Sequence, residues 1–538
     1  MSRQTPQIDP AQLLPPTWDA KHDVLLIVGE NAGSIAAPFV DYGLKRVICM
    51  FPDPLEIEAV PNGARCVTSR GALTRTVNLF PGTQPRRFAT IRTPSCSLDI
   101  PTTKGLQTLL GQLVQQKSAF RHAQDHLAPL WAHNGLRNLP HIGQHPMVTD
   151  IGDQLKDVPL IIVGAGPSLE KNIDQLRAAQ GKTIILAVNR TLRSLQNAGV
   201  CPDFVINLEP RDVACQFEGI DLQNITGLVL SVTSHPTLFH LDVPNLLTFA
   251  GNLEAEQWLF DAEDNVVEIA SRGTVSCSAM SLALQWKCNP IILVGQDLSF
   301  PGGAYYHAGG ADGATQAEYD EDEKRWVLKG YSEDLANTLR AEHGSKPLSF
   351  EGTEVPGYFG GTVPTSTAFA TFRSWFENTA LDHPNRELYN CTEGGAFIDG
   401  MKHVPLSVAL RDLPPRDIEL PSLLSNENLS KVVAARQQRM AQRAASIHTG
   451  LQEAMNMALD CIKLIDRCQN DPKKTGKLQA AEAELSKLLK SLSILSLMDQ
   501  RKIREAAAEG KKATTFSEAL GASRKLYGLI VEESRRLL

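Results

Sequence analysis

The feature that most constrains the fold of this chain is the segment VPLIIVGAGPSLE at residues 158–170, which reads as strand, glycine turn and helix start. Its apolar run at 160–163 is typical of a strand covered on both faces. Gly164 and Gly166 can take positive φ and let a ligand approach the backbone closely. Ser168 places a hydroxyl among the free N–H groups of a helix start, where anions bind. We expect either the phosphate of a nucleotide or nucleotide-sugar here or a tight turn without a ligand, because GAGPSL is neither GxGxxG nor a P-loop.

Five further apolar runs follow the same pattern, and helices separate most of them. The expected strands cover residues 160–163, 183–188, 204–207, 227–232, 246–249 and 291–294, with a helix at 276–286. Strands that alternate with helices predict an open, mostly parallel sheet, whose ligands lie at the carboxyl ends of the strands. Five of these strand ends are polar, at residues 164–166, 189–190, 207–209, 233–235 and 295–297. This convergence is the best evidence from the residues themselves for a binding site.

The two ends of the chain have different characters. Residues 22–29 and 45–51 read as the strands of a βαβ unit, but Gly29 and Gly33 alone make an incomplete dinucleotide fingerprint, so we expect a degenerate structural half-domain. Residues 103–145 read as helix and connection. From residue 429 onward apolar residues recur at helical spacing, which predicts one long amphipathic helix, a break at 471–476 and two further helices around 478–498 and 515–537.

With 538 residues the chain has room for roughly three or four domains of about 150 residues each. We therefore expect an α/β protein with a smaller N-terminal Rossmann-like α/β domain at residues 1–130, a central Rossmann-like domain with a mostly parallel sheet at 131–415, and a C-terminal helical domain at 416–538. Residues 301–365 are glycine-rich and acidic, and a connection of this length predicts an ordered lid or a flexible insertion. The acidic run at 318–323 matches no calcium loop, so no metal site is expected.

Composition limits the class of protein. Residues 427–538 carry 20 Lys+Arg and 13 Asp+Glu, a net charge of +7, which leaves −14 on the remainder of a chain whose total is −7. The mixed signs and the absence of a recognisable motif argue against a nucleic-acid partner. Ten scattered cysteines without a CxxC pair favour reduced thiols. No secretory signal or apolar run of about 20 residues is visible, so we expect a cytoplasmic protein without a membrane span.

Four segments together resemble the motility-associated factor (Maf) flagellin glycosyltransferases. They are GAGPSL at 164–169, CPDFVIN at 201–207, GQDLSF at 295–300 and YNCTEGGAFI at 389–398, and the resemblance covers roughly residues 130–405. It implies a transferase that moves a nonulosonic acid of the pseudaminic or legionaminic type from a CMP-activated donor to Ser/Thr hydroxyls of flagellin, in the assembly of a flagellum for motility. It also implies flagellin as the protein partner and no tightly bound cofactor.

The central domain is also distantly similar to bacterial CMP-sialic-acid sialyltransferases. That similarity assigns donor contacts to Gly164, Gly166, Ser168, Asn189, Asn207, Thr274, Ser276 and Tyr305. The chain departs from the pattern in three places. Ala165 replaces the Asn of the glycine turn, Ser299 stands at one of the two tyrosine positions, and the position of the catalytic His falls on Gly361.

The base that activates the acceptor hydroxyl must therefore come from elsewhere. Candidates are His307, His235, Asp297 and Glu393. His307 has a fitting unperturbed pKa and lies on the expected lid, although a single His in a glycine-rich loop is commonly just exposed. Asp297 can equally be a structural hydrogen-bond acceptor at a strand end, and Glu393 can orient donor or acceptor. The turn at 164–168, with Tyr305, would hydrogen-bond the leaving phosphate, so no metal is obligatory.

Two other functions remain open from the sequence. The GxGPSL domain also resembles an archaeal-type 6-hydroxymethyl-dihydropterin pyrophosphokinase. Such an enzyme would use ATP and Mg²⁺, and the acidic residues would then bind the metal ion. Alternatively, the missing His fits a non-catalytic flagellin-binding chaperone that has kept a nucleotide fold.

Overall fold

Contacts between residues divide the chain into two units in the computed structural model. The structure describes residues 8–79, 87–251, 253–260, 266–267, 269–270, 274–310, 312–333, 335–336, 349–350, 352–470, 475–491 and 498–538. The first unit holds residues 1–122, Ser366–Asn385 and Ile398–Gly400, and the second holds the remainder. The helical C-terminal region thus lies in the same unit as the large sheet. The three domains expected at 1–130, 131–415 and 416–538 stay a prediction.

The first unit is built on a four-stranded parallel sheet in the order β3-β2-β1-β4. Its strands are β1 (Val24–Val28), β2 (Val47–Met50), β3 (Ala64–Val67) and β4 (Phe88–Arg92). Its helices are α1 (Pro10–Leu13), α2 (Ala32–Asp41), α3 (Arg70–Leu79), α11 (Thr367–Asp382) and the first part of α4 (Ile100–Gln144). Every residue of β1 is buried, because one core cluster packs on each face of the sheet. The predicted βαβ unit is confirmed.

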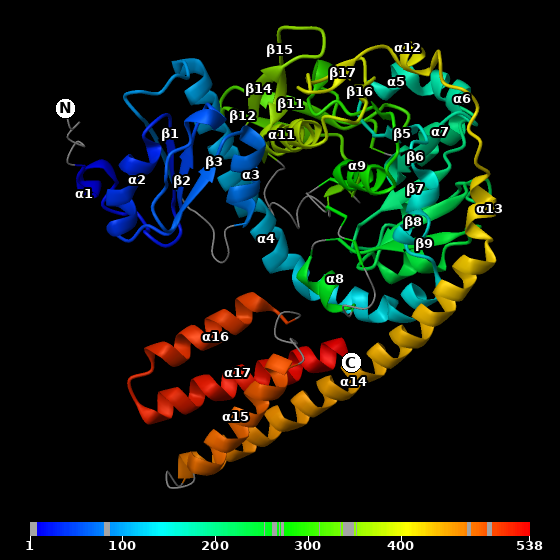
Figure 1. Ribbon diagram of the computed structural model, residues 1–538. Coiled ribbons are helices and arrows are strands. Elements are labelled where there is room, and N and C mark those ends of the chain that lie inside the picture. Colours follow the sequence, from blue (N-terminus) through cyan, green and yellow to red (C-terminus); the bar gives the residue numbers. More distant parts are fainter. Residues whose placement is uncertain are drawn as a thin grey trace. The chain divides into compact units, whose positions relative to one another are not determined.

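The second unit contains an eight-stranded sheet in which every strand pairing is parallel (Figure 1). The order is β17-β16-β10-β5-β6-β7-β8-β9. The strands are β5 (Leu160–Val163), β6 (Ile184–Val188), β7 (Phe204–Asn207), β8 (Gly227–Ser231), β9 (Leu246–Phe249), β10 (Ile291–Val294), β16 (Leu388–Asn390) and β17 (Lys402–His403). From β5 the strands follow in chain order through β6, β7 and β8 to β9 on one side. The next strand along the chain, β10, pairs with the opposite side of β5. The point between β5 and β10, where the order reverses, is where parallel sheets usually bind ligands.

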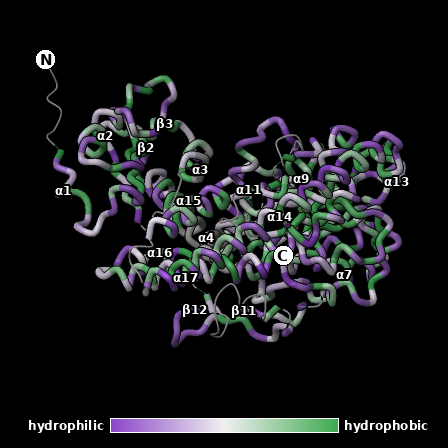
Figure 2. Tube along the Cα trace, turned by 90° about the horizontal axis from the view of Figure 1, so that it is seen from below, coloured by the Kyte–Doolittle hydropathy of each residue, from purple (hydrophilic) through white to green (hydrophobic). Residues whose placement is uncertain are grey.

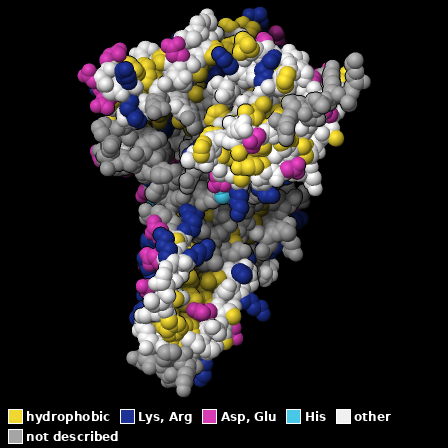
Figure 3. All heavy atoms as spheres, turned by 90° about the vertical axis from the view of Figure 1, so that its left-hand side faces the viewer, with side chains coloured by type: hydrophobic (Ala, Val, Ile, Leu, Met, Phe, Trp, Pro, Cys, Tyr) yellow, Lys and Arg dark blue, Asp and Glu magenta, His cyan; other side chains and the backbone are white. Residues whose placement is uncertain are grey.

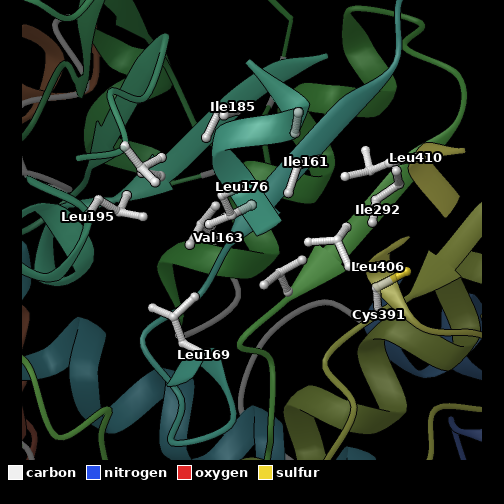
Figure 4. Close-up of a cluster of buried hydrophobic side chains, with 14 residues drawn as sticks. Ile161, Val163, Leu169, Leu176, Ile185, Leu195, Ile292, Cys391, Leu406 and Leu410 are labelled. Atoms are coloured by element: carbon white, nitrogen blue, oxygen red, sulfur yellow. The ribbon is translucent and has the colours of Figure 1, made fainter. Parts of the chain in front are cut away.

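Helices cover both faces of the eight-stranded sheet. On one face α9 (Val275–Gln285) contacts β5, β6 and β7. On the other, Ile161, Ile185 and Ile292 point into a buried cluster (Figure 4). Leucines of α5 (Leu169–Asn172), α6 (Leu176–Ala179), α7 (Leu192–Asn197) and α12 (Leu406–Leu410) complete that cluster. The six strands expected from the sequence in this region are all confirmed, because each is an apolar run buried on both faces.

Residues 301–365, expected to be a lid or an insertion, contain short strands of their own. One small antiparallel sheet joins β11 (Gln316–Asp320), β12 (Arg325–Lys329) and β13 (Ser349–Phe350). A two-stranded sheet joins β14 (Gly352–Pro356) and β15 (Thr362–Ser366). Gly361, the position that matched the sialyltransferase His, has φ +67° in the turn between these two strands.

The C-terminal region is helical, as expected. It contains α13 (Leu420–Leu424), α14 (Glu427–Asn470), α15 (Thr475–Ser491), α16 (Gln500–Lys512) and α17 (Phe516–Leu537). Outside this region, the short helix α8 (Glu254–Trp258) follows β9 of the larger sheet. Both hydrophobic and hydrophilic residues occur along α16 and α17 (Figure 2), and α17 contacts both α14 and α16. The predicted break at 471–476 falls mostly outside the described residues. Among the helices that the structure describes, none is both long and apolar enough to cross a membrane.

Candidate functional site

The turns after β5 and β10 touch each other at the point where the strand order reverses. Neither Gly164 nor Gly166 has positive φ, so the backbone conformation expected of these glycines is wrong. A Cβ on Gly164 would lie 2.7 Å from the carbonyl oxygen of Gly295, and a Cβ on Gly166 would overlap the carboxylate of Asp297. The close approach predicted for a ligand is therefore made by the protein's own neighbouring turn.

The carboxylate of Asp297 fills the anion position at the start of α5. The Ser168 backbone N–H donates to Asp297 Oδ2 at 3.1 Å, and its hydroxyl donates to Oδ1 at 2.5 Å. Burial raises the pKa of Asp297 to about 6, although the hydrogen bonds from Ser168 oppose the shift. Of the two roles considered for Asp297, the structure shows the hydrogen-bond acceptor at a strand end. The donors of Ser168, expected to meet a ligand phosphate, are directed at this carboxylate.

The segment with the sequence Thr-Glu-Gly-Gly covers this junction. Ala396 N–H donates to the Asp297 carbonyl at 2.7 Å. Gly395 has φ +72°, and a Cβ there would overlap the Asp297 backbone. Glu393, expected to orient donor or acceptor, accepts hydrogen bonds from Asn172 Nδ2 at 2.8 Å and from the N–H of Leu406 at 3.0 Å. These contacts hold Glu393 between α5 and α12.

The first unit repeats the same arrangement at its own β1–α2 turn. Glu58 Oε1 accepts a hydrogen bond from the Gly33 N–H at 3.0 Å, at the start of α2. A Cβ on Gly33 would overlap the carbonyl of Ala59. A protein carboxylate thus takes the place where a nucleotide phosphate sits in a working dinucleotide fold.

A small cavity of about 20 Å³ lies at the carboxyl ends of β5 and β6. Its lining comes from four parts of the second unit: the β5 turn and α5, the segment from the end of β6 into α7, the 3₁₀ turn Ala214–Phe217 after β7, and the start of the expected lid. The lining residues are Ala165, Leu169, Asn189, Arg190, Thr191, Arg193, Ser194, Gln216, Tyr306, His307, Gly310 and Asp312. A cavity of this size holds about one water molecule.

Two pairs of polar side chains in this cavity are bound to each other. Asn189 Nδ2 donates to Gln216 Oε1 at 2.5 Å. The Arg190 guanidinium pairs with the buried carboxylate of Asp312 and lies 5.4 Å from the centre of the Tyr306 ring. Arg190 therefore presents a partly shielded positive charge, with an aromatic face beside it, at the carboxyl edge of the sheet.

His307 is buried rather than exposed on a loop. Its side chain is only 7% exposed, and its backbone N–H donates to the Ala165 carbonyl at 2.9 Å. Gly309 N–H donates to Nδ1 at 3.2 Å, so Ser194 Oγ, 3.1 Å from Nδ1, donates there as well. This network assigns the ring proton to Nε2. Nε2 lies 2.9 Å from Glu170 Oε2, at ion-pair distance but without the alignment of a hydrogen bond.

The remaining predicted site residues lie outside this lining. Asn207 Oδ1 accepts from the Glu209 N–H at 2.8 Å and shapes the turn after β7. Thr274 precedes α9 without a side-chain cap, and Ser276 is buried in its first turn. His235 Nδ1 lies 2.8 Å from Thr237 Oγ1 at the start of a short 3₁₀ turn. Tyr305 stacks on Phe300, with ring centres 5.5 Å apart.

Sequence reasoning brought together only Asn189 and His307 among the side chains of this lining. It missed Ser194, Gln216, Tyr306 and Asp312 and did not single out Arg190. A signal existed for two of them, because Arg190 directly follows the polar strand end and Tyr306 is adjacent to the selected Tyr305. The described residues hold no group of three or more His, Cys, Asp or Glu side chains placed to bind a metal ion.

Comparisons with known proteins match different parts of the chain. A protein-family model described as MptE-like, 6-hydroxymethylpterin diphosphokinase MptE-like, matches residues 133–303. An uncharacterized protein of Treponema pallidum (strain Nichols) is 34% identical over 92 residues, which are 17% of this chain and 42% of that protein. The match thus spans less than half of that relative.

The solved structure of a MAf glycosyltransferase from Magnetospirillum magneticum AMB-1 aligns over 96% of this chain and 78% of that one, with 14% identity and a TM-score of 0.46. An alignment at this level assigns no function. Residues 133–303, which contain β5–β10 and much of the cavity, are therefore the part of the chain that is similar to a described family.

Proposed function

We propose that this protein is a glycosyltransferase that moves a nonulosonic acid from a CMP-activated donor to Ser/Thr hydroxyls of flagellin. The observation that carries the proposal is the cavity at the ends of β5 and β6, where Arg190, Tyr306 and His307 meet. It combines a cation, an aromatic face and an imidazole at the edge where parallel sheets bind nucleotides. The CMP-activated donor and the flagellin acceptor are inferred from the sequence segments that resemble the Maf family.

The site would have to open before it could bind a nucleotide. Pockets for small organic ligands usually enclose about 300–1,000 Å³, far more than the 20 Å³ found here. His307 and Asp312 close the cavity, through the hydrogen bond from His307 N–H to the Ala165 carbonyl and through the pair between Asp312 and Arg190. Release of these two contacts would free Arg190 for the donor phosphate and would expose the imidazole.

His307 is the proposed base. In the closed arrangement Nδ1 already accepts hydrogen bonds, so the acceptor hydroxyl would take the place of the Ser194 hydroxyl at this atom. Glu170 would stay beside Nε2 and would stabilise the imidazolium that forms when Nδ1 takes the proton.

The test measures transfer directly. Purified protein is incubated with flagellin and CMP-pseudaminic or CMP-legionaminic acid, and CMP release is compared with the added mass on flagellin. We expect both signals from the wild type, at least a tenfold loss of transfer with retained CMP binding in His307→Ala, and loss of donor binding in Arg190→Gln. Arg177→Gln is the matched control, because Arg177 lies outside the cavity and is 55% exposed. Flagellin binding without CMP release from either donor would instead support a non-catalytic chaperone.

A second candidate is favoured by the family model at residues 133–303, whose description names a 6-hydroxymethylpterin diphosphokinase. Such an enzyme would transfer diphosphate from ATP to a pterin hydroxymethyl group and release AMP. Incubation with ATP, Mg²⁺ and 6-hydroxymethyl-dihydropterin separates the two functions, because AMP formation supports the kinase and replaces the transferase proposal.

A further inference from the structure

The first unit contains a larger cavity that the proposed function does not use. Its volume is about 490 Å³, and it lies at the carboxyl ends of β2 and β3, between the starts of α3 and α4. Its lining residues are Met50, Pro52, Thr68, Ser69, Arg70, Leu98, Pro101, Thr102, Gly105 and Leu106. We propose that this cavity binds a small phosphate ester the size of a sugar phosphate or mononucleotide.

The lining separates into an apolar part and a polar part. Met50 and Leu106 are buried, with 5% and 2% of their surfaces exposed, and form apolar walls. Thr68, Ser69 and Thr102 add hydroxyl groups. Mostly apolar walls with a few polar groups are typical of sites for small organic molecules, and the volume is in the usual range for them.

Arg70 gives this cavity its charge preference. Among the described lining residues it is the one charged side chain, so an anionic group gains a partner there without facing a carboxylate of this described lining. Its positive charge also acts on Glu377 of α11, but Glu377 already forms an ion pair with Arg373 at 2.6 Å. A guanidinium binds phosphate oxygens in a forked geometry, which favours a phosphate over a neutral ligand.

The backbone of α3 adds donors beside Arg70. Its first intrahelical hydrogen bond runs from the Leu73 N–H to the Ser69 carbonyl, and the Ala72 N–H donates to Ser69 Oγ. The N–H groups of Arg70 and Gly71 precede these bonds at the positive end of the helix. They supplement the guanidinium and do not define the site by themselves.

Gly105 is a second feature of the lining, and it leaves the cavity open on the side of α4. It lies inside α4, where glycine is less favourable than alanine by about 0.5–1 kcal/mol. A Cβ at this position would have no atom within 4 Å, because the residue borders the open cavity. A larger side chain at position 105 would therefore fit without a clash and would occupy part of the cavity.

The experiment uses the full-length protein and isothermal titration with inorganic phosphate, ribose 5-phosphate, AMP and CMP. We expect at least one ester to bind more tightly than inorganic phosphate. We also expect Arg70→Gln and Gly105→Leu each to weaken that binding at least tenfold. Arg65→Gln on β3 and Gly521→Leu on α17 are the matched controls, because neither residue lines the cavity and Gly521 also has open space around its Cβ.

Thermal unfolding of each variant first shows that it folds like the wild type, and Gly105→Ala replaces Gly105→Leu if the larger side chain lowers the melting temperature. Lack of binding by all esters, binding that survives either cavity variant, or binding that Arg190→Gln removes would overturn the proposal. Because Arg190 lies in the second unit, this outcome also separates failure of the new site from failure of the proposed transferase site.

Discussion

The Asp297 carboxylate holds the turn after β5 by hydrogen bonds, but its burial disfavours the charged form of the group. Its carboxylate is 2% exposed, and burial raises its pKa from an ordinary value of 3.8 to about 6. The folded protein therefore holds this proton between about pH 4 and pH 6, where the unfolded chain has released it. Stability contributed by the protonated carboxyl is thus lost as the pH rises through this window.

We expect Asp297→Asn to remove the loss of stability that the wild type undergoes when Asp297 ionises with rising pH. The shift of about two pKa units corresponds to about 3 kcal/mol, so the stability of the variant relative to wild type should rise by up to that amount between pH 4 and pH 7. Urea unfolding across this pH range measures the difference. A constant difference at all pH values would contradict the assigned titration. Comparison with wild type cancels the contributions of other buried carboxyls such as Glu256 and Glu377, whose pKa values are also raised by burial.

At the scale of elements, the turns after β5 and β10 fit together because glycines stand at their contact. We expect Gly166→Ala to destabilise the protein by about 2–3 kcal/mol, because its Cβ would overlap the buried Asp297 carboxylate. Gly476→Ala in α15 is the control, since a Cβ there meets no atom within 4 Å, and it should be neutral or slightly stabilising. Chemical denaturation measures both variants, and equal effects would contradict the packing argument.

Elements with a strong local signal could be predicted, and those that depend on distant neighbours could not. Strands β5 to β10 are apolar runs with buried faces, so their pattern is visible in the sequence. Strands β16 and β17 have only three and two residues and are held in place by pairing to β10 and to each other. The role of Gly166 was misread for the same reason, because nothing in its own segment indicates that Asp297 lies against it. Of the site, Asn189 was found at a polar strand end and His307 as a candidate base on the expected lid, whereas Ser194 and Gln216 come together only through folding.

At the scale of the whole chain, one face of the protein carries side chains of both charges (Figure 3). On the face shown in Figure 3, Lys and Arg side chains lie next to Asp and Glu side chains. Within the helical region, Lys502 pairs with Glu532 and Lys525 pairs with Glu509. Part of the positive charge of this region is therefore paired with carboxylates of its own helices.

Within the second unit, a largely buried ion pair attaches the long helix α14 to the segment that precedes the large sheet. Arg436 donates two hydrogen bonds of 2.8 Å to the carboxylate of Asp150. We expect Arg436→Met to destabilise the protein by about 3–5 kcal/mol, because Asp150 would stay buried without its partner. Lys431→Met on the same helix breaks only an exposed pair and should cost less than about 1 kcal/mol. Urea denaturation compares the two variants, and similar losses would show that the Arg436 pair is not an anchor.

The carboxylates of Glu58 and Asp297 make both glycine turns self-sufficient. A phosphate loop that lacks its anion leaves helix donors unpaired, so its order depends on ligand supply. Here the required negative charge is encoded in the chain and arrives when the chain folds. A cell that runs short of nucleotide would leave these two turns intact. Evolution of a new ligand preference could then proceed in the surrounding cavities without loss of the scaffold that frames them.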